Sequence, residues 1–125
     1  MVSKGLNRNT ILVVEDETLI RLMVADALRA AGFEVIEAAN ADEALAILES
    51  QPPIDLVFAD VRMPGTMDGV GLMKLLRETR PNLKLAVASG CSPDWPSPNL
   101  VDDFVGKPYD VARAVNRIKS LLNCE

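Results

Sequence analysis

The amino-acid sequence predicts an α/β domain built around a parallel β-sheet, and three observations support this prediction. Short runs rich in Val, Ile and Leu alternate with longer stretches of helical period, which is the pattern of βα units. The length of 125 residues is typical of one domain, and a hydrophobic content of 49% is enough for a buried core. We expect residues 1–9 to form a flexible polar arm and residues 10–123 to form the domain.

The first strand is expected over residues 11–14, an apolar run that ends at an acidic pair. A helix is expected over about residues 17–31, because its apolar residues recur at helical spacing and share one face. These residues are Ile20, Val24, Ala27, Leu28 and Ala31. Gly32 ends the helix, since glycine readily adopts the backbone conformation that closes a helix C-terminus.

The next unit has a strand over residues 33–37, followed by a helix. Asn40 has the position of the N-cap of this helix and Glu43 that of its third-residue partner, a pair that satisfies free N–H groups. A third strand over residues 54–59 is almost wholly apolar. We therefore expect it at the centre of the sheet, buried on both faces.

The second half of the chain predicts a helix, a strand, a short or irregular helix, a strand and a last helix. They are expected over about residues 70–79, 83–88, 90–99, 103–106 and 110–122, respectively. Residues 90–99 contain a glycine and several prolines, so the fourth of the five or so helices is expected to be short or irregular. The last helix carries an apolar stripe opposite its basic residues.

The composition argues against several classes of function. The formal net charge of -5, without a long run of Lys or Arg, argues against binding to nucleic acid or to an anionic membrane. No apolar stretch approaches the roughly 20 residues of a membrane span, so we expect a cytoplasmic protein. Cys91 and Cys124 lack the spacing of a disulfide framework or a zinc site. The absence of histidine excludes catalytic triads and histidine phosphocarriers within this chain.

Polar side chains follow four of the expected strands at the point where each strand ends. Glu15 and Asp16 follow the first strand, Asp60 the third, Ser89 the fourth and Lys107 the fifth. The carboxyl ends of parallel strands form the rim at which open α/β sheets bind ligands. Carboxylates brought together at this rim repel one another, and a hard divalent cation relieves the repulsion. Mg²⁺ is the cation that suits a few carboxylates plus phosphate oxygens.

The same residues suit phosphoryl transfer. A carboxylate such as that of Asp60 can attack phosphorus and form an acyl phosphate if the charge on the moving group is neutralised. Lys107 and the cation can neutralise that charge, and the Ser89 hydroxyl can donate a hydrogen bond to a phosphoryl oxygen.

Four spaced motifs resemble the receiver domains of bacterial response regulators in two-component signalling. The motifs are ILVVEDE, FADVRMPG, AVASG and FVGKPY, and the resemblance covers about residues 10–123. It implies a flavodoxin-like, doubly wound sheet of five parallel strands in the order 2-1-3-4-5. It also implies that Mg²⁺ is the cofactor and that a sensor histidine kinase or a histidine phosphotransfer protein supplies the phosphoryl group.

The resemblance assigns a role to each candidate site residue. Asp60 is implied as the phosphoacceptor and as a metal ligand. Asp16 is implied as a direct metal ligand and Glu15 as a ligand through water, with the carbonyl of Arg62 as a further ligand.

A second group of residues is implied to bind the phosphoryl group and to switch. Ser89 and Lys107 are the implied phosphoryl-binding pair, and Phe104 has the position of the switch aromatic that follows Ser89. Such a module changes its binding surface toward a downstream target, or acts as a phosphate sink, or is part of a hybrid kinase. We expect a monomer or weak homodimer that phosphorylates itself from a donor and slowly loses the group, rather than a true enzyme.

The chain departs from the usual family pattern at two places. The loop between Pro64 and Asp68 is one residue longer than usual, which alters the approach to Asp60. The segment between Ser89 and Lys107 is shorter by about one helical turn and rich in proline, as in stand-alone and hybrid-kinase receivers.

Simpler interpretations of single residues stay open at this stage. Glu15 and Asp16 suit a solvated strand end or a helix cap, and Asp60 and Ser89 suit turns. Lys107 suits an ordinary surface position, and Phe104 suits a plain core position. Two alternative functions also remain.

The first alternative function is an aspartate-nucleophile phosphatase of the haloacid dehalogenase type. Such enzymes need a second Asp at the position that Arg62 occupies. The second is an interaction module of the same fold that never carries phosphate.

Overall fold

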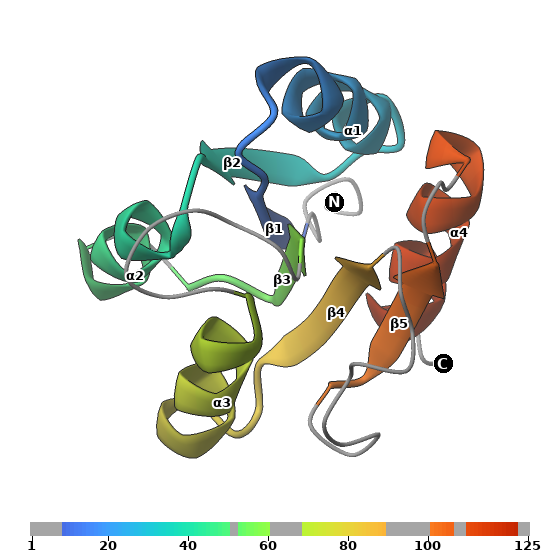
Figure 1. Ribbon diagram of the computed structural model, residues 1–125. Helices are drawn as coiled ribbons and strands as arrows, with labels where there is room; N and C mark the ends of the chain where they lie inside the picture. Colours follow the sequence, from blue (N-terminus) through green and yellow to red (C-terminus); the bar gives the residue numbers. More distant parts are fainter. Residues whose placement is uncertain (1–8, 51–52, 61–68, 90–100, 107–109, 123–125) are drawn as a thin grey trace, which may run out of the picture.

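The structure, a computed structural model, describes residues 9–50, 53–60, 69–89, 101–106 and 110–122 (Figure 1). In chain order, its elements are β1 (Thr10–Val14), α1 (Thr18–Ala30), β2 (Glu34–Ala38), α2 (Ala41–Ser50), β3 (Leu56–Asp60), α3 (Gly69–Thr79), β4 (Lys84–Ser89), β5 (Asp103–Gly106) and α4 (Val111–Leu122). The strands form one parallel sheet in the order β2-β1-β3-β4-β5. The predicted fold class and strand order are therefore confirmed.

Helices cover both faces of the sheet (Figure 1). α1 and α4 pack on one face, and α2 and α3 pack on the other. Because successive strand residues point to opposite faces, Ile11 and Val13 join the core under α1 and α4, whereas Leu12 and Val14 join the core under α2 and α3. Every residue of β3 is buried, which confirms the prediction that the third strand lies at the centre of the sheet.

The ends of α1 and α2 are set by the residues that the sequence indicates. Gly32 follows α1 with a φ of 103°, a left-handed conformation that glycine adopts at little steric cost. At the start of α2, the Glu43 N–H donates to Asn40 Oδ1 at 2.8 Å, and the Ala39 N–H donates to Glu43 Oε1 at 2.7 Å. The capping pair is confirmed, although the Glu43 carboxylate binds the N–H before Asn40 rather than that of Asn40 itself.

The observed bounds differ most from the expected ones at the third strand. β3 begins at Leu56 and includes Asp60, whereas the sequence predicts a strand over residues 54–59 with Asp60 just beyond it. Asp60 pairs with Ala88 of β4, so backbone pairing extends the strand despite the low strand preference of aspartate. Residues 90–99, where a short or irregular helix is expected, lie outside the described residues.

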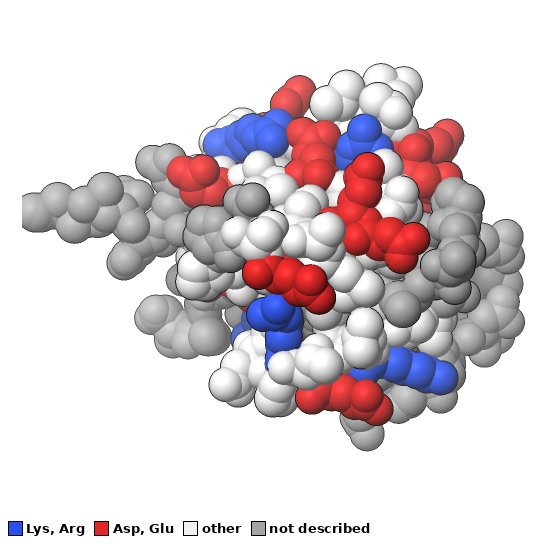
Figure 2. Space-filling view, turned by 90° about the vertical axis from the view of Figure 1, so that its left-hand side faces the viewer, with Lys and Arg blue, Asp and Glu red and all other residues white. Residues whose placement is uncertain are grey.

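Both signs of charge occur on the surface of the described residues. Figure 2 shows acidic and basic side chains interspersed on the face that carries α2. On this face, the excess of negative charge is therefore not gathered into one patch. Among the helices that the structure describes, none combines the length and apolar character needed to cross a lipid bilayer.

Candidate metal centre

The register of the central strands brings the ends of β1 and β3 side by side. Val14, the last residue of β1, pairs with Ala59 of β3. The residues that follow this pair, Glu15 and Asp60, therefore lie at the same rim of the sheet. Because the strands are parallel, this is the carboxyl rim, at which α/β sheets bind ligands. Asp16 lies in the connection between β1 and α1.

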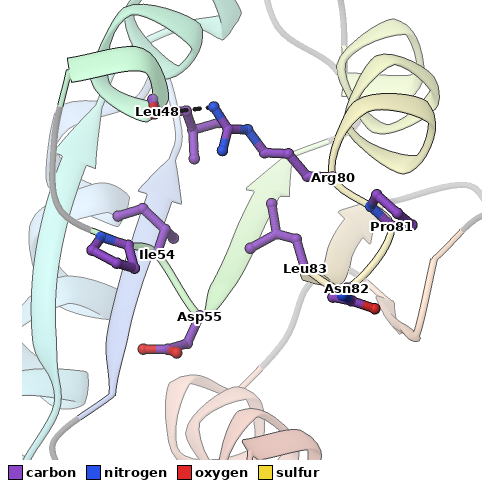
Figure 3. A pocket seen from close by; sticks show the side chains of 8 residues that line it. Leu48, Ile54, Asp55, Arg80, Pro81, Asn82 and Leu83 are labelled. Atoms are coloured by element: carbon purple, nitrogen blue, oxygen red, sulfur yellow. Dashed lines mark hydrogen bonds between the residues drawn. The ribbon is translucent and has the colours of Figure 1, made fainter.

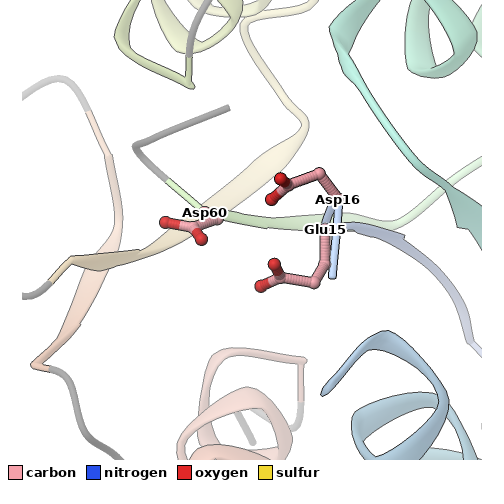
Figure 4. A group of neighbouring side chains, drawn as sticks. All are labelled: Glu15, Asp16 and Asp60. Carbon is pink, nitrogen blue, oxygen red and sulfur yellow. The ribbon is translucent and has the colours of Figure 1, made fainter. Parts of the chain in front are cut away.

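Carboxylates from both strand ends meet at this rim (Figure 4). Glu15, Asp16 and Asp60 each place one carboxylate oxygen within 4.8 Å of the other two. Figure 4 shows the side chains extending from neighbouring strand ends toward a shared space. Glu15 and Asp60 are only 5% and 6% exposed, whereas Asp16 is exposed. We call these residues the acidic rim, and their convergence agrees with what the strand ends in the sequence predict.

The acidic rim fits a hard divalent cation. Mg²⁺ prefers oxygen ligands at about 2.0–2.1 Å and keeps several waters. Ligand atoms on opposite sides of such an ion are about 4 Å apart, so oxygens within 4.8 Å need only small movements to share one. The exposed side at Asp16 leaves room for water. The residues present therefore suit Mg²⁺ better than a soft metal, which would call for thiolate or imidazole ligands.

Hydrogen bonds hold Glu15 at three points. Its N–H donates to the Ala38 carbonyl at 3.0 Å, and its Oε2 accepts from the Glu17 N–H at 3.1 Å. Its backbone carbonyl accepts from Arg21 Nη1 at 2.7 Å. Arg21 Nε also donates to Glu37 Oε1 at 3.2 Å. The motifs in the sequence do not predict these hydrogen bonds of Arg21. The signal that the sequence offers for them is the position of Glu37, an acidic residue near the end of the second strand.

The backbone places Ser89 at the same rim. Asp60 pairs with Ala88, so Ser89 follows one position further along β4. Ser89 in turn pairs with Gly106, the last residue of β5. The side chain of Ser89 lies outside what the structure describes, as does the whole of Lys107.

The remaining predicted site residues are placed only in part. The backbone of Phe104 pairs with Val87 inside the sheet. Its side chain is not among those described, so its switch role stays a prediction. Arg62 lies outside the described residues.

A pocket of about 500 Å³ lies near the amino-terminal ends of β3 and β4, opposite the carboxyl rim of the sheet (Figure 3). Its lining comes from the end of α2 and the segments that precede β3 and β4: Leu48, Pro53, Ile54, Asp55, Arg80, Pro81, Asn82 and Leu83. Arg80 Nη2 donates to the Leu48 carbonyl at 3.1 Å, which satisfies a carbonyl in the last turn of α2. Asp55 Oδ2 accepts from the Thr10 N–H at 2.8 Å. These groups hold the fold together, so the acidic rim is the better candidate site.

Comparison with known proteins identifies the family. The response regulator receiver domain family matches residues 11–119. The chain is 38% identical over 118 residues to sensor kinase CckA of Brucella abortus (strain 2308). The aligned region covers 90% of this chain and 12% of that kinase. It is 32% identical over 119 residues to the phosphate regulon transcriptional regulatory protein PhoB of Pseudomonas aeruginosa, which covers 90% of this chain and 51% of that protein.

A solved structure gives the same result. The response regulator protein TrrA from Thermotoga maritima, in complex with Mg²⁺-BeF, has a TM-score of 0.80 and 29% identity, with 90% of this chain and 98% of that chain covered. The chain therefore belongs to the response regulator receiver domain family, whose members are signalling modules. It spans only 12% and about half of the length of the two curated relatives.

Proposed function

We propose that this chain accepts a phosphoryl group on Asp60 in a Mg²⁺-dependent reaction and thereby switches its interaction surface. The observation that carries the proposal is the acidic rim, in which Glu15, Asp16 and Asp60 lie within reach of one cation. Support comes from the relative TrrA, which was crystallised with Mg²⁺ and beryllofluoride. Beryllofluoride stands in for a phosphoryl group, because it is tetrahedral and anionic like one.

Each site residue has its own role in such a reaction. The ion would be held by Asp16 directly, by Glu15 through water, and by Asp60 and the Arg62 carbonyl. When bound, it would neutralise charge on the phosphoryl oxygens. An Asp60 carboxylate oxygen attacks phosphorus, and the O–P bond forms as the bond between phosphorus and the histidine nitrogen of the phosphodonor breaks. Lys107 and the Ser89 hydroxyl bind phosphoryl oxygens.

The donor in this proposal is a phosphohistidine on a sensor histidine kinase or a histidine phosphotransfer protein. The 125 residues contain no histidine, so the phosphohistidine lies outside them, and the similarity to sensor kinase CckA supports a kinase. We place the exchange in the cytoplasm, on a domain of residues 10–123 that is monomeric or weakly dimeric. Beyond accepting the group and slowly hydrolysing it, the domain has no turnover of its own.

Movement of Ser89 toward the bound phosphoryl group would start the switch. Phe104 would follow that movement and change the surface around β4 and α4 to which a downstream target binds. Phosphate storage or a place within a hybrid kinase are other uses of the same reaction.

Intact-mass analysis after incubation with acetyl phosphate tests the proposal. We expect one added phosphoryl group on the wild-type chain with Mg²⁺, none with a chelator and none on Asp60→Asn. Asp26→Asn is the matched control, because the Asp26 side chain is 77% exposed and lies on α1, and it should label like the wild type. Labelled Asp60→Asn protein would contradict the site, and sustained rapid hydrolysis of a generic phosphate ester would favour a phosphatase instead.

A further inference from the structure

A linked set of side chains connects α1 and β2 to the acidic rim. Arg21 donates to the Glu15 carbonyl at 2.7 Å and to Glu37 Oε1 at 3.2 Å. Arg29 Nη2 donates to the other Glu37 oxygen at 3.1 Å, so α1 supplies donors to both oxygens of Glu37. The side chains of Arg21 and Glu37 are 17% and 22% exposed. Their ion pair is therefore partly shielded from water and screened less than a surface pair.

The stability of α1 does not explain why Arg21 is there. Arg21 is the fourth residue of the helix, and the helix dipole favours cations at the opposite end. The buried face of α1 consists of Val24, Ala25 and Leu28, so Arg21 is not part of the apolar core. One of its hydrogen bonds goes instead to Glu15, at the strand end that carries the predicted metal ligands, and the other goes to Glu37 on β2.

The hydrogen bond to the Glu15 carbonyl acts on two ligands at once. This carbonyl and the N–H of Asp16 belong to one planar peptide unit. A donor that holds the carbonyl therefore fixes the rotation of the unit that joins Glu15 to Asp16. The preceding unit is held by the hydrogen bond from the Glu15 N–H to the Ala38 carbonyl. The peptide planes on both sides of Glu15 are thus fixed, one by β2 and the other by Arg21.

We infer that Arg21, anchored by Glu37, is a positioning residue that sets the directions of Glu15 and Asp16 for Mg²⁺. This inference rests on the proposed function, because it requires that the acidic rim binds the ion. The charge of Arg21 is paired with that of Glu37, so the effect of Arg21 is orientation rather than repulsion of the cation. Partners that orient metal ligands typically contribute 10–100-fold to metal affinity, and we expect loss of the Arg21 side chain to weaken Mg²⁺ binding about tenfold.

The test compares Arg21→Ala with Arg29→Ala in the full chain. Both variants remove an arginine from α1 and change the net charge equally. The Arg29 hydrogen bonds go to Glu37 and the Val35 carbonyl, on β2. Calorimetric titration with Mg²⁺ gives the dissociation constant, and urea unfolding gives the stability separately. We expect Arg21→Ala to bind Mg²⁺ about tenfold more weakly and Arg29→Ala to keep the wild-type affinity.

Wild-type affinity in a folded Arg21→Ala protein, or equal weakening in both variants, would overturn the inference. If Arg21→Ala does not fold, Arg21→Lys replaces it, because lysine keeps the charge but lacks the planar fork of donors. An unchanged affinity in that variant would overturn the inference as well. If the wild-type chain binds no Mg²⁺, the proposed function itself fails, so the two failures are distinguishable.

Discussion

The carboxylates of the acidic rim repel one another in the metal-free fold. Glu15 and Asp60 are almost fully buried, and their carboxylates are grouped with that of Asp16. Like charges about 4 Å apart repel by about 1–4 kcal/mol, depending on the local dielectric, and burial adds a desolvation cost. A cation bound by these side chains would relieve this repulsion.

The substitution Asp60→Asn should stabilise the metal-free protein. It removes one charge from the group without a large change in shape, so we expect the free energy of unfolding to rise by about 1 kcal/mol in the presence of a chelator. Urea unfolding measures this change, with Asp26→Asn as a control at an exposed position of α1. A less stable Asp60→Asn protein would show that the interactions of the Asp60 carboxylate within the fold outweigh this repulsion.

Among the elements, α1 has two faces with different tasks. Val24 and Leu28 are buried in the core between α1 and the sheet, whereas Leu19, Leu22 and Met23 are exposed large hydrophobic residues. The buried face holds the helix in place, and this placement brings Arg21 to the strand end. Packing of α1 and geometry of the acidic rim are therefore linked.

Leucines on the two faces of α1 should respond differently to truncation. Leu28 is 0% exposed and Leu22 is 43% exposed. We expect Leu28→Ala to lower the free energy of unfolding by about 2–5 kcal/mol, because it leaves a cavity. Leu22→Ala should change it by about 0.5 kcal/mol or less. Urea unfolding of both variants checks this, and equal losses would mean that α1 packs differently.

An ion pair joins α4 to β5, the edge strand at the end of the sheet away from β2. Arg117 Nε donates to Asp103 Oδ2 at 2.7 Å, and its Nη2 donates to the other oxygen. This hydrogen bonding, together with the charge of Asp103, raises the pKa of Arg117 above its ordinary value. The guanidinium therefore stays charged near neutral pH, and the pair adds no pH dependence there through Arg117.

Much of the fold follows from local sequence patterns. Apolar periodicity predicts every described helix and strand, and Asn40 and Glu43 predict the start of α2. The end of β3 is placed one residue short, because strand preference disfavours Asp60 while its pairing with Ala88 extends the ladder. Pairing with a neighbouring strand is a tertiary effect that a local pattern does not contain.

The grouping of carboxylates in the acidic rim can be predicted from the sequence, but the contact between Arg21 and Glu37 that supports it cannot. Residues that follow parallel strands meet at one rim whatever the packing details, so Glu15, Asp16 and Asp60 can be brought together from the sequence. The contact between Arg21 and Glu37 depends on how α1 lies across β2. That angle follows from the packing of buried side chains and cannot be read from residue spacing.

Over the whole molecule, the sheet connects the site to folding. The acidic rim combines residues that follow β1 with the last residue of β3, so it exists only when these strands are paired. A cation that binds this arrangement binds the folded state and not the unfolded chain. Binding free energy therefore adds to the stability of the whole domain.

This linkage gives a thermal test with beryllofluoride, the phosphoryl stand-in. A ligand at 100 times its dissociation constant stabilises the folded state by about 2.7 kcal/mol, which for a domain of this size is a rise in Tm of roughly 10 °C. We expect Mg²⁺ with beryllofluoride to raise the Tm well beyond Mg²⁺ alone, as followed by circular dichroism.

Asp60→Asn should lose the increment from beryllofluoride, because its amide cannot replace the carboxylate oxygen that joins beryllium. Asp26→Asn, changed at an exposed site, should retain it. Equal increments in wild type and Asp60→Asn would place the ligand away from the acidic rim. No increment in the wild type would favour an interaction module that never carries phosphate. The thermal shift thus distinguishes a phosphoacceptor from an interaction module of the same fold, because only the phosphoacceptor gains stability through Asp60.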